Sequence, residues 1–456
     1  MRRFRLIDRE IDYLLPPSVQ DWLPPSHLAR YVVDVVEGLD LSAIERAYAG
    51  RGSDAYHPAL LLSLLIYGYA TGTHSSRKIE RATYDSLAFR FIACDQHPDH
   101  DTLANFRRRF GEQFTAIFVQ VLQLARENQL SRFGTVSLDG TKIHANASRH
   151  SALSYGHAQK IEAQLHAEVQ EMLALAEAAD QSTVPDGVSL PEEIQRREDR
   201  LAAIARAKTV IEARAKARDE REQVAYQAKL AQREAKQKAT GKKPGGKPPE
   251  PPPAGPRADD QINLTDEDSR IMKVSGGGFE QCYNGQAVVD TESMLILAQY
   301  VTQAGNDKEQ VTPMLAVLQA LPDGWAPQTL LADTGYFSAT NVEACVAASI
   351  EPLMAVGRDA HHPAWRERFE EPTVLPAPAS AVEQMKHALK TKHGRAAYAL
   401  RKQTVEPVFG IIKSVMNFRQ FLLRGLAHVS HEWTLVYLAW NFKRMAMLRL
   451  KSVQRA

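Results

Sequence analysis

Two carboxylates stand at the ends of short apolar segments, and each is followed within two residues by a glycine. Asp139 ends the segment of residues 135–139, and Asp333 ends the segment of residues 329–333. A single Asp beside a glycine is usually a turn-former, but two strands of the same design can present two carboxylates together. A third acid, Glu406, lies within the most basic part of the chain. Three acids of this kind predict a metal site.

The chemistry suited to such a site is phosphoryl transfer. Hard divalent cations such as Mg²⁺ take oxygen ligands, and two of them about 3.5–4 Å apart can hold the attacking and leaving oxygens of a phosphodiester. The carboxylates must then converge from elements that are distant in the sequence. His144 and His150 follow the first Asp closely, but imidazole is a poor match for Mg²⁺, so neither is a candidate ligand.

Four stretches of the chain carry a specific family resemblance. They are YNGQAVVD at residues 283–290, NDK at 306–308, DTGY at 333–336 and VEPVFG at 405–410. In this order, together with the segment that ends at Asp139, they resemble the catalytic signatures of the DDE transposases of bacterial insertion sequences. The resemblance covers nearly the whole chain.

The resemblance implies a fold, a reaction and a set of site residues. The fold is α/β, a ribonuclease-H-like mixed sheet flanked by helices, with an N-terminal all-α domain. The reaction is metal-dependent cleavage of double-stranded DNA at the ends of the element, after which the freed 3′-hydroxyl attacks target DNA. Asp139, Asp333 and Glu406 are then the catalytic acids and the ligands of two Mg²⁺ ions, for which Mn²⁺ can substitute. The resemblance also implies a homodimer or a larger assembly on DNA.

Several residues near Glu406 match a further part of the family pattern. In related transposases a Tyr, an Arg and a Lys flank the Glu at characteristic offsets, and the nearest matches are Tyr398, Arg401 and Lys413. Arg401 lies five residues before Glu406 where the pattern has four, and Lys402 occupies the matching place. Either residue could therefore fill the role.

Pro407, the residue after Glu406, restricts the conformation of the backbone there. Pro407 disfavours the α conformation at the residue before it and has no N–H to donate. We therefore expect a helix to begin or to kink at Glu406. On an uninterrupted helix downstream, Lys413 returns to the face of Glu406 after about two turns, where it could hold a DNA phosphate.

Basic residues are concentrated around Glu406, although the net charge of the whole chain is only +2. Residues 386–424 contain nine Lys or Arg and a single acid. Such a patch is the electrostatic footprint of a polyanion; the alternative is a solvated basic face. We predict DNA contacts from Arg419 and from the residues that flank Glu406, namely Tyr398, Arg401, Lys402 and Lys413.

The first 130 residues read as an N-terminal helical domain. Residues 26–37 carry apolar side chains at helical spacing, and Pro58 fits the first turn of the helix that follows. A further helix, capped by Asp101 or Thr102, is expected to run through a series of phenylalanines to residue 122.

Two arginines on that last helix, Arg107 and Arg108, are predicted DNA contacts of a helix-turn-helix. The alternative is that the Arg triplet at residues 107–109 forms a solvated helix face and that the domain only packs on the catalytic core.

The catalytic domain is expected to be interrupted once. Its first part is residues 131–151 and its second part is residues 261–425. Between them, residues 152–240 are rich in Ala, Glu, Gln, Lys and Arg and predict an antiparallel helical hairpin. Residues 241–260 form a linker, because seven prolines and four glycines in its first sixteen residues prevent packing. Residues 426–456 predict a C-terminal helix.

The apolar segments of the catalytic domain predict the order β, β, β, α, β, α, β, α, with the strand that ends at Asp139 first. This is the ribonuclease-H-like order.

Bulk properties exclude several classes of protein. At 456 residues and 44% hydrophobic content the chain is globular, with two or three domains. Three cysteines far apart form no disulfide framework. The basic N-terminus leads into charged residues and does not read as a signal peptide. The longest apolar run, residues 59–70, is too short to span a bilayer. We therefore expect a cytoplasmic protein without membrane contact.

Two other functions fit the same motifs. One is a DNA-binding remnant that no longer transposes, and the other is a nuclease of the same fold that cleaves DNA without joining it.

Overall fold

The computed structural model describes residues 19–48, 55–177, 189–241, 245–274, 276–357, 370–375 and 378–455. The chain divides into two compact units: Met1–His144 with Tyr283–Ala456, and Ala145–Cys282. Within the described ranges, none of the helices combines the length and the apolar character needed to cross a membrane.

Short helices precede the first strand of the first unit. They are α1 (Val19–Trp22), α2 (Leu28–Glu37), α3 (Ser42–Glu45), α4 (Pro58–Thr71), α5 (Ser76–Asp85), α6 (Leu87–Ile92), α7 (His100–Arg109) and α8 (Gln113–Glu127). Helix α4 is buried along most of its length, because its sequence is apolar on every face. Pro58 occupies its first turn, and Gly72 ends it with a φ of 85°, which glycine adopts without strain.

The single helix expected to reach residue 122 is wrong, because two helices, α7 and α8, occupy this stretch. Asp99, not Asp101 or Thr102, caps α7, since its side chain accepts a hydrogen bond from the backbone N–H of Thr102. The chain turns at Gly111, where an added Cβ would lie 2.7 Å from Cβ of His431. The apolar spacing continues across the turn, so it did not reveal the break.

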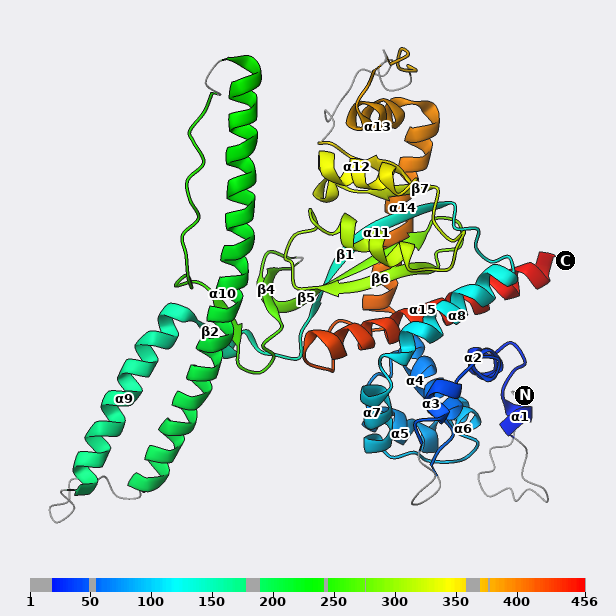
Figure 1. The fold of residues 1–456 in the computed structure, drawn as a ribbon. Helices are drawn as coiled ribbons and strands as arrows, with labels where there is room; N and C mark the ends of the chain where they lie inside the picture. The colour runs from blue at the N-terminus through cyan, green and yellow to red at the C-terminus, as the bar shows by residue number, and fades with distance from the viewer. Residues whose placement is uncertain are drawn as a thin grey trace, which may run out of the picture. The chain divides into compact units, whose positions relative to one another are not determined.

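The sheet of the first unit is mixed (Figure 1). Its strands are β1 (Thr135–His144), β5 (Phe279–Asp290), β6 (Ile296–Thr302), β7 (Thr329–Ala332) and β8 (Glu351–Met354). They are ordered β6-β5-β1-β7-β8. Strands β5 and β6 are antiparallel, whereas β1 is parallel to β7 and β7 is parallel to β8. The predicted mixed α/β architecture is confirmed.

Within the described residues, five further helices belong to this unit. They are α11 (Val311–Gln319), α12 (Ala339–Ala347), α13 (Ala381–Lys390), α14 (Lys392–Ser414) and α15 (Leu426–Arg455). Helix α15 packs on β6 and also on α2, α4 and α8, so it joins the N-terminal helices to the sheet. Its Trp433 covers Gly285 of β5, where an added Cβ would lie 2.6 Å from the indole ring.

A buried polar network lies where α4, α7 and α15 meet. Glu432 is fully buried and accepts a hydrogen bond of 2.6 Å from the Tyr69 hydroxyl. Arg107 donates to the same hydroxyl at 2.7 Å and lies 3.7 Å from the Glu432 carboxylate. The second carboxylate oxygen accepts from the backbone N–H groups of Leu422 and Leu423. The buried charge of Glu432 is therefore both paired and hydrogen-bonded, as burial requires.

The second unit is built on two long helices, α9 (Tyr155–Glu177) and α10 (Leu190–Thr240) (Figure 1). The two helices run antiparallel. The start of α9 contacts a later part of α10, and a later part of α9 contacts the start of α10. Glu168 binds Arg197 at 2.7 Å, and Tyr155 binds Glu212 at 2.8 Å. Leu165 and Ile204 belong to the apolar core between the helices. Residues 178–188, between the two helices, lie outside the described residues.

Three short strands complete this unit. Strand β2 (Ala152–Ser154) pairs with β3 (Gln261–Asn263), and β4 (Arg270–Lys273) pairs with residues 279–282 of β5. The Pro/Gly-rich segment contacts α10, contrary to the expectation that it cannot pack: Gly255 O accepts a hydrogen bond of 3.0 Å from Arg218, and the Gly255 N–H donates one of 2.6 Å to Asp219. Residues 242–244 of the predicted linker lie outside the described residues.

Candidate active site

The sheet positions Asp139 and Asp333 side by side. The expectation that a strand ends at Asp139 is wrong, because β1 continues to His144 and Asp139 lies in its middle, whereas Asp333 directly follows β7. Parallel pairing matches Thr135 with Thr329 and Ser137 with Leu331. Continued by two residues, this register places Asp139 level with Asp333. Neighbouring strands lie about 4.8 Å apart, so both carboxylates belong to one locality.

Each acid is also held by its own backbone. Asp139 accepts a hydrogen bond of 2.8 Å from the N–H of Gly140. Asp333 accepts one of 2.7 Å from the N–H of Gly335 and caps the short 3₁₀ turn Thr334–Tyr336. The glycines after both acids therefore supply local N–H donors, in agreement with the Asp-turn chemistry of such sequences.

Glu406 lies within α14, a continuous helix that begins at Lys392. Of the two alternatives expected at Glu406, a helix start is wrong, since α14 begins earlier and contains Pro407; a kink there stays a prediction. Gln403, Glu406 and Pro407 are all exposed. Pro407 has no N–H to donate to the carbonyl of Gln403, four residues earlier. Because both residues are exposed, water can hydrate this carbonyl, which reduces the free-energy cost of a proline inside the helix.

Arg401 contacts both Asp139 of β1 and Glu406 of α14. Its guanidinium lies 3.7 Å from Asp139 Oδ2 and donates a hydrogen bond of 3.2 Å to Glu406 Oε1. Arg401 is buried, with 8% of its surface exposed, whereas Lys402 is exposed. Of the two residues that could match the family pattern, the structure places Arg401 in the site.

The electrostatics of Asp139 reflect crowded negative charge. Burial and the nearby carboxylates of Asp333 and Asp307 raise its pKa from 3.8 to about 7, while the Gly140 N–H and Arg401 act in the opposite direction. Burial also raises the pKa of Tyr336 well above its usual value, and the same three carboxylates add to this effect. Asp139, Asp307 and Asp333 therefore each influence the pKa of the Tyr336 hydroxyl.

This donor set fits a hard divalent cation. It consists of carboxylate oxygens, which Mg²⁺ prefers, and their crowding is the kind that a cation relieves. In the present arrangement the guanidinium of Arg401 supplies the positive charge between Asp139 and Glu406. Across the described ranges, no three His, Cys, Asp or Glu side chains are yet grouped closely enough to ligate an ion.

The other predicted residues of α14 lie along the same helix. The Tyr398 hydroxyl donates to Ala332 O at 3.3 Å, at the end of β7. Lys413 Nζ donates to Lys142 O at 3.0 Å and so ties α14 to β1. Just beyond the helix, Arg419 is exposed and its Nε donates to Lys413 O.

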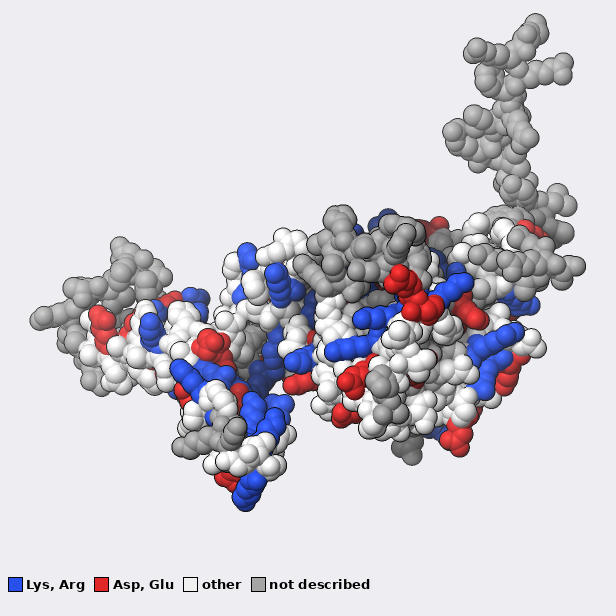
Figure 2. Space-filling model, turned by 90° about the horizontal axis from the view of Figure 1, so that it is seen from above, with Lys and Arg blue, Asp and Glu red and all other residues white. Residues whose placement is uncertain are grey.

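The two N-terminal arginines have different environments. Arg107 is buried and paired with Glu432, so the prediction that it contacts DNA is wrong: its guanidinium faces the protein core. Arg108 is exposed on α7, and its DNA contact stays a prediction. On the face drawn in Figure 2, Lys and Arg side chains are interspersed with Asp and Glu and do not form one uniform basic surface.

Sequence reasoning assigned no role to Asp307, although it noted the NDK stretch. Asp307 Oδ1 accepts hydrogen bonds of 2.7 Å from Asn284 and from Gln286. Both amides are fully buried. No local pattern joins β5 to residue 307, so only the shared motif order could have drawn attention to this group.

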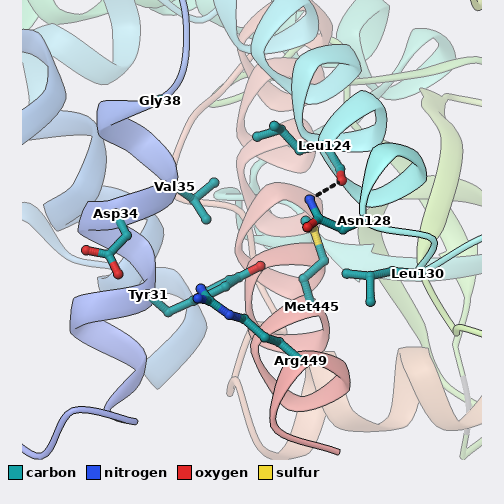
Figure 3. Close-up of a pocket in the computed structure, with 9 residues that line it drawn as sticks. All are labelled: Tyr31, Asp34, Val35, Gly38, Leu124, Asn128, Leu130, Met445 and Arg449. Carbon is teal, nitrogen blue, oxygen red and sulfur yellow. Dashed lines mark hydrogen bonds between the residues drawn. The ribbon is translucent and has the colours of Figure 1, made fainter. Parts of the chain in front are cut away.

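A cavity of about 360 Å³ lies elsewhere in this unit (Figure 3). It is lined by residues of α2, α8 and α15, among them Tyr31, Leu124 and Met445, with Arg449 beside the Tyr31 ring. None of the candidate catalytic acids lines it, so it is separate from the candidate active site.

The pKa of Asp139 predicts how the stability of the metal-free protein depends on pH. Because the folded state raises this pKa from 3.8 to about 7, the stabilising contribution is complete below about pH 4 and is lost as the pH rises through about 7. We expect the unfolding temperature in EDTA to fall over this range, and to fall less in Asp139→Asn. Calorimetric scans of both proteins measure the difference; identical pH profiles would contradict the prediction.

Two family models match the chain. Residues 17–109 match the family described as Transposase domain (DUF772), and residues 259–442 match the family described as Transposase DDE domain. The first match spans α1 to α7, and the second contains Asp333 and Glu406. No curated protein and no solved structure matches the chain.

Proposed function

Because the chain belongs to the DDE transposases of insertion sequences, we propose that it cleaves DNA at the ends of an element and joins the freed 3′ ends to target DNA. Asp139, Asp333 and Glu406 are the proposed catalytic acids. One observation carries this assignment: Arg401 contacts both Asp139 and Glu406. This contact links Asp139 of β1 to Glu406 of α14, next to the strand that leads to Asp333.

The sheet topology supports the proposal. The observed order β6-β5-β1-β7-β8, with β5 and β6 antiparallel and β1, β7 and β8 parallel, is the arrangement expected of a ribonuclease-H-like domain. In this proposal residues 1–130 form the helical domain, residues 131–151 and 261–425 form the catalytic domain, and residues 152–240 are its insertion. Residues 241–260 are its linker, and residues 426–456 are the last helix.

The three acids are the residues that would hold divalent ions, proposed to be two Mg²⁺. When bound, such ions supply activation of the attacking hydroxyl and neutralisation of charge on the phosphodiester. Asp139 is mostly buried, with 19% of its side chain exposed, whereas the Glu406 side chain is 52% exposed. Asp139 therefore forms the fixed side of the site, and Glu406 forms the side that DNA can approach.

The flanking residues of α14 orient this machinery. Arg401 holds Glu406 toward Asp139, Tyr398 joins α14 to the end of the Asp333 strand, and Lys413 joins it to β1. These contacts fix the helix acid against the strands that carry the other two. We propose that the DNA is bound by a homodimer or a larger assembly, as the family resemblance implies.

A strand-transfer assay with labelled element ends and Mg²⁺ tests the proposal. Joined product supports a transposase, cleaved product alone supports the nuclease alternative, and bound but unaltered DNA supports the inactive remnant. The match to the Transposase DDE domain supports the first outcome. Complete absence of joined product with both Mg²⁺ and Mn²⁺ would contradict the proposal.

The exposed basic residues beside the site predict how DNA binding depends on salt. Lys402 and Arg419 are both exposed. Replacing both by Gln should weaken binding to all DNA sequences similarly, and it should reduce the slope of log K against log salt by about one unit per lost phosphate contact. Binding titrations across salt concentrations measure this. Lys216→Gln serves as the control, because Lys216 is exposed on the hairpin helix α10, and it should leave the slope unchanged. An unchanged slope in the double variant would mean that Lys402 and Arg419 contact solvent and not DNA phosphates.

A further inference from the structure

Asp307 is held on the sheet by two buried amides of β5. Asn284 Nδ2 donates to Asp307 Oδ1 at 2.7 Å and to Ala304 O at 3.2 Å. Gln286 Nε2 donates to the same Asp307 oxygen at 2.7 Å, and Gln286 Oε1 accepts from the Tyr336 hydroxyl at 2.6 Å. The neighbours fix the orientation of both amides, because each NH₂ group faces acceptors.

This network covers the backbone that directly follows Asp139. An added Cβ at Gly140 would clash with Gln286 Nε2 and would lie 2.8 Å from Asp307 Oδ1 and 2.9 Å from Asn284 Oδ1. Glycine is therefore what allows the network to pack on β1. The Gly140 N–H in turn donates to Asp139 Oδ1, so the residue that the network touches is also the residue that holds the carboxylate.

The network and the Asp139 carboxylate lie on opposite sides of the strand. Successive side chains of a strand point to opposite faces, so the Cβ direction of Gly140 is opposite to that of Asp139. The arrangement of β5 agrees with this, because Trp433 of α15 covers Gly285, and its neighbours Asn284 and Gln286 face the other way. Asp139 is contacted instead by Arg401 of α14.

We propose that Asp307 is a positioning residue: with Asn284 and Gln286 it supports Gly140 from behind and thereby sets the direction of the Asp139 carboxylate. The inference rests on the proposed role of Asp139 as a metal ligand. The shared Oδ1 is what matters in this role, because removing it takes the acceptor from the buried Gln286 NH₂ group and leaves the Asn284 NH₂ group with Ala304 O alone. The network would then collapse away from Gly140 or admit water beside it.

The contact with Lys142 is secondary. Lys142 Nζ lies 3.8 Å from Asp307 Oδ1, and neither side chain is fully buried. This separation is much longer than the 2.7 Å of the two amide hydrogen bonds to the same oxygen. An Asn at position 307 keeps an oxygen that can accept both amide bonds and loses only this weaker attraction, so the acceptor and the charge can be tested separately.

The test measures Mn²⁺ affinity of the full-length protein without DNA, by electron paramagnetic resonance, with thermal unfolding of each variant recorded in parallel. Asp307→Ala and Gly140→Ala are expected to weaken Mn²⁺ binding by about 10–100-fold, the range typical of lost support behind a metal ligand. Asp307→Asn should keep most of the affinity. Asp139→Asn provides the reference for loss of the ligand itself.

Gln299→Ala is the matched control for a purely structural effect. Gln299 lies in β6 of the same sheet and donates a hydrogen bond of 2.7 Å to Thr434 of α15. Its loss should lower the unfolding temperature while leaving the Mn²⁺ affinity of the folded protein unchanged.

Three results would overturn the inference in distinguishable ways. If Asp139→Asn loses Mn²⁺ and Asp307→Ala does not, Asp307 does not position the ligand. If Asp307→Asn loses as much affinity as Asp307→Ala, the charge and not the acceptor is needed. If Asp139→Asn itself keeps the wild-type affinity, the proposed metal site is wrong and the inference falls with it.

Discussion

Asp139→Asn, Asp333→Asn and Glu406→Gln should each reduce strand cleavage and joining by about a thousandfold or more, while DNA binding and folding persist. Each change keeps the size of the side chain and much of its hydrogen bonding, but it removes a charge that a divalent ion requires. Affinity for DNA comes mainly from basic residues, so binding should change little. Cleavage and strand-transfer rates with labelled ends, measured beside DNA-binding titrations, test both statements.

The combined variants and a control sharpen this prediction. Effects should be strongly non-additive, because residues that serve one site are disabled together. Asp323→Asn is the matched control, since Asp323 is an exposed acid in a turn before Gly324, whose φ is 76°. It should retain activity. A folded Glu406→Gln variant with normal strand transfer in Mg²⁺ would remove Glu406 from the site.

Arg107→Met should destabilise the folded protein by about 3–5 kcal/mol, the usual cost of leaving one member of a buried ion pair uncompensated. Glu432 is fully buried, and Arg107 is its cationic neighbour across α7 and α15. Tyr69 and the N–H groups of Leu422 and Leu423 remain as hydrogen-bond partners, but they carry no compensating charge. Urea-induced unfolding, followed by tryptophan fluorescence, measures the change.

Arg108→Met is the internal control for this effect. Arg108 is the next residue on α7 and is exposed, so its replacement should change the stability by no more than about 0.5 kcal/mol. If the two variants are equally stable, the network at Glu432 does not hold the N-terminal helices against α15. If Arg107→Met instead keeps its stability but loses DNA binding, the original prediction of a DNA contact is restored.

The strands and helices of the catalytic core could be read from the sequence. Apolar runs predicted the strand that ends near Asp333 and the order of strands and helices along the catalytic domain. These signals are local, because hydrophobic periodicity and turn residues act over a few positions. The break at Gly111 escaped the same reasoning, since the close approach of His431 that accompanies it comes from the other end of the chain.

The sequence by itself determined which acids are candidates, their order, and the family to which they point, because residue types and short motifs are properties of the chain alone. The tertiary structure decided the rest. Arg401, not Lys402, contacts Asp139 and Glu406. Arg107 is buried beside Glu432, and Asp307 lies next to Gly140. Each of these outcomes depends on burial and on contacts between distant segments, which no local pattern encodes.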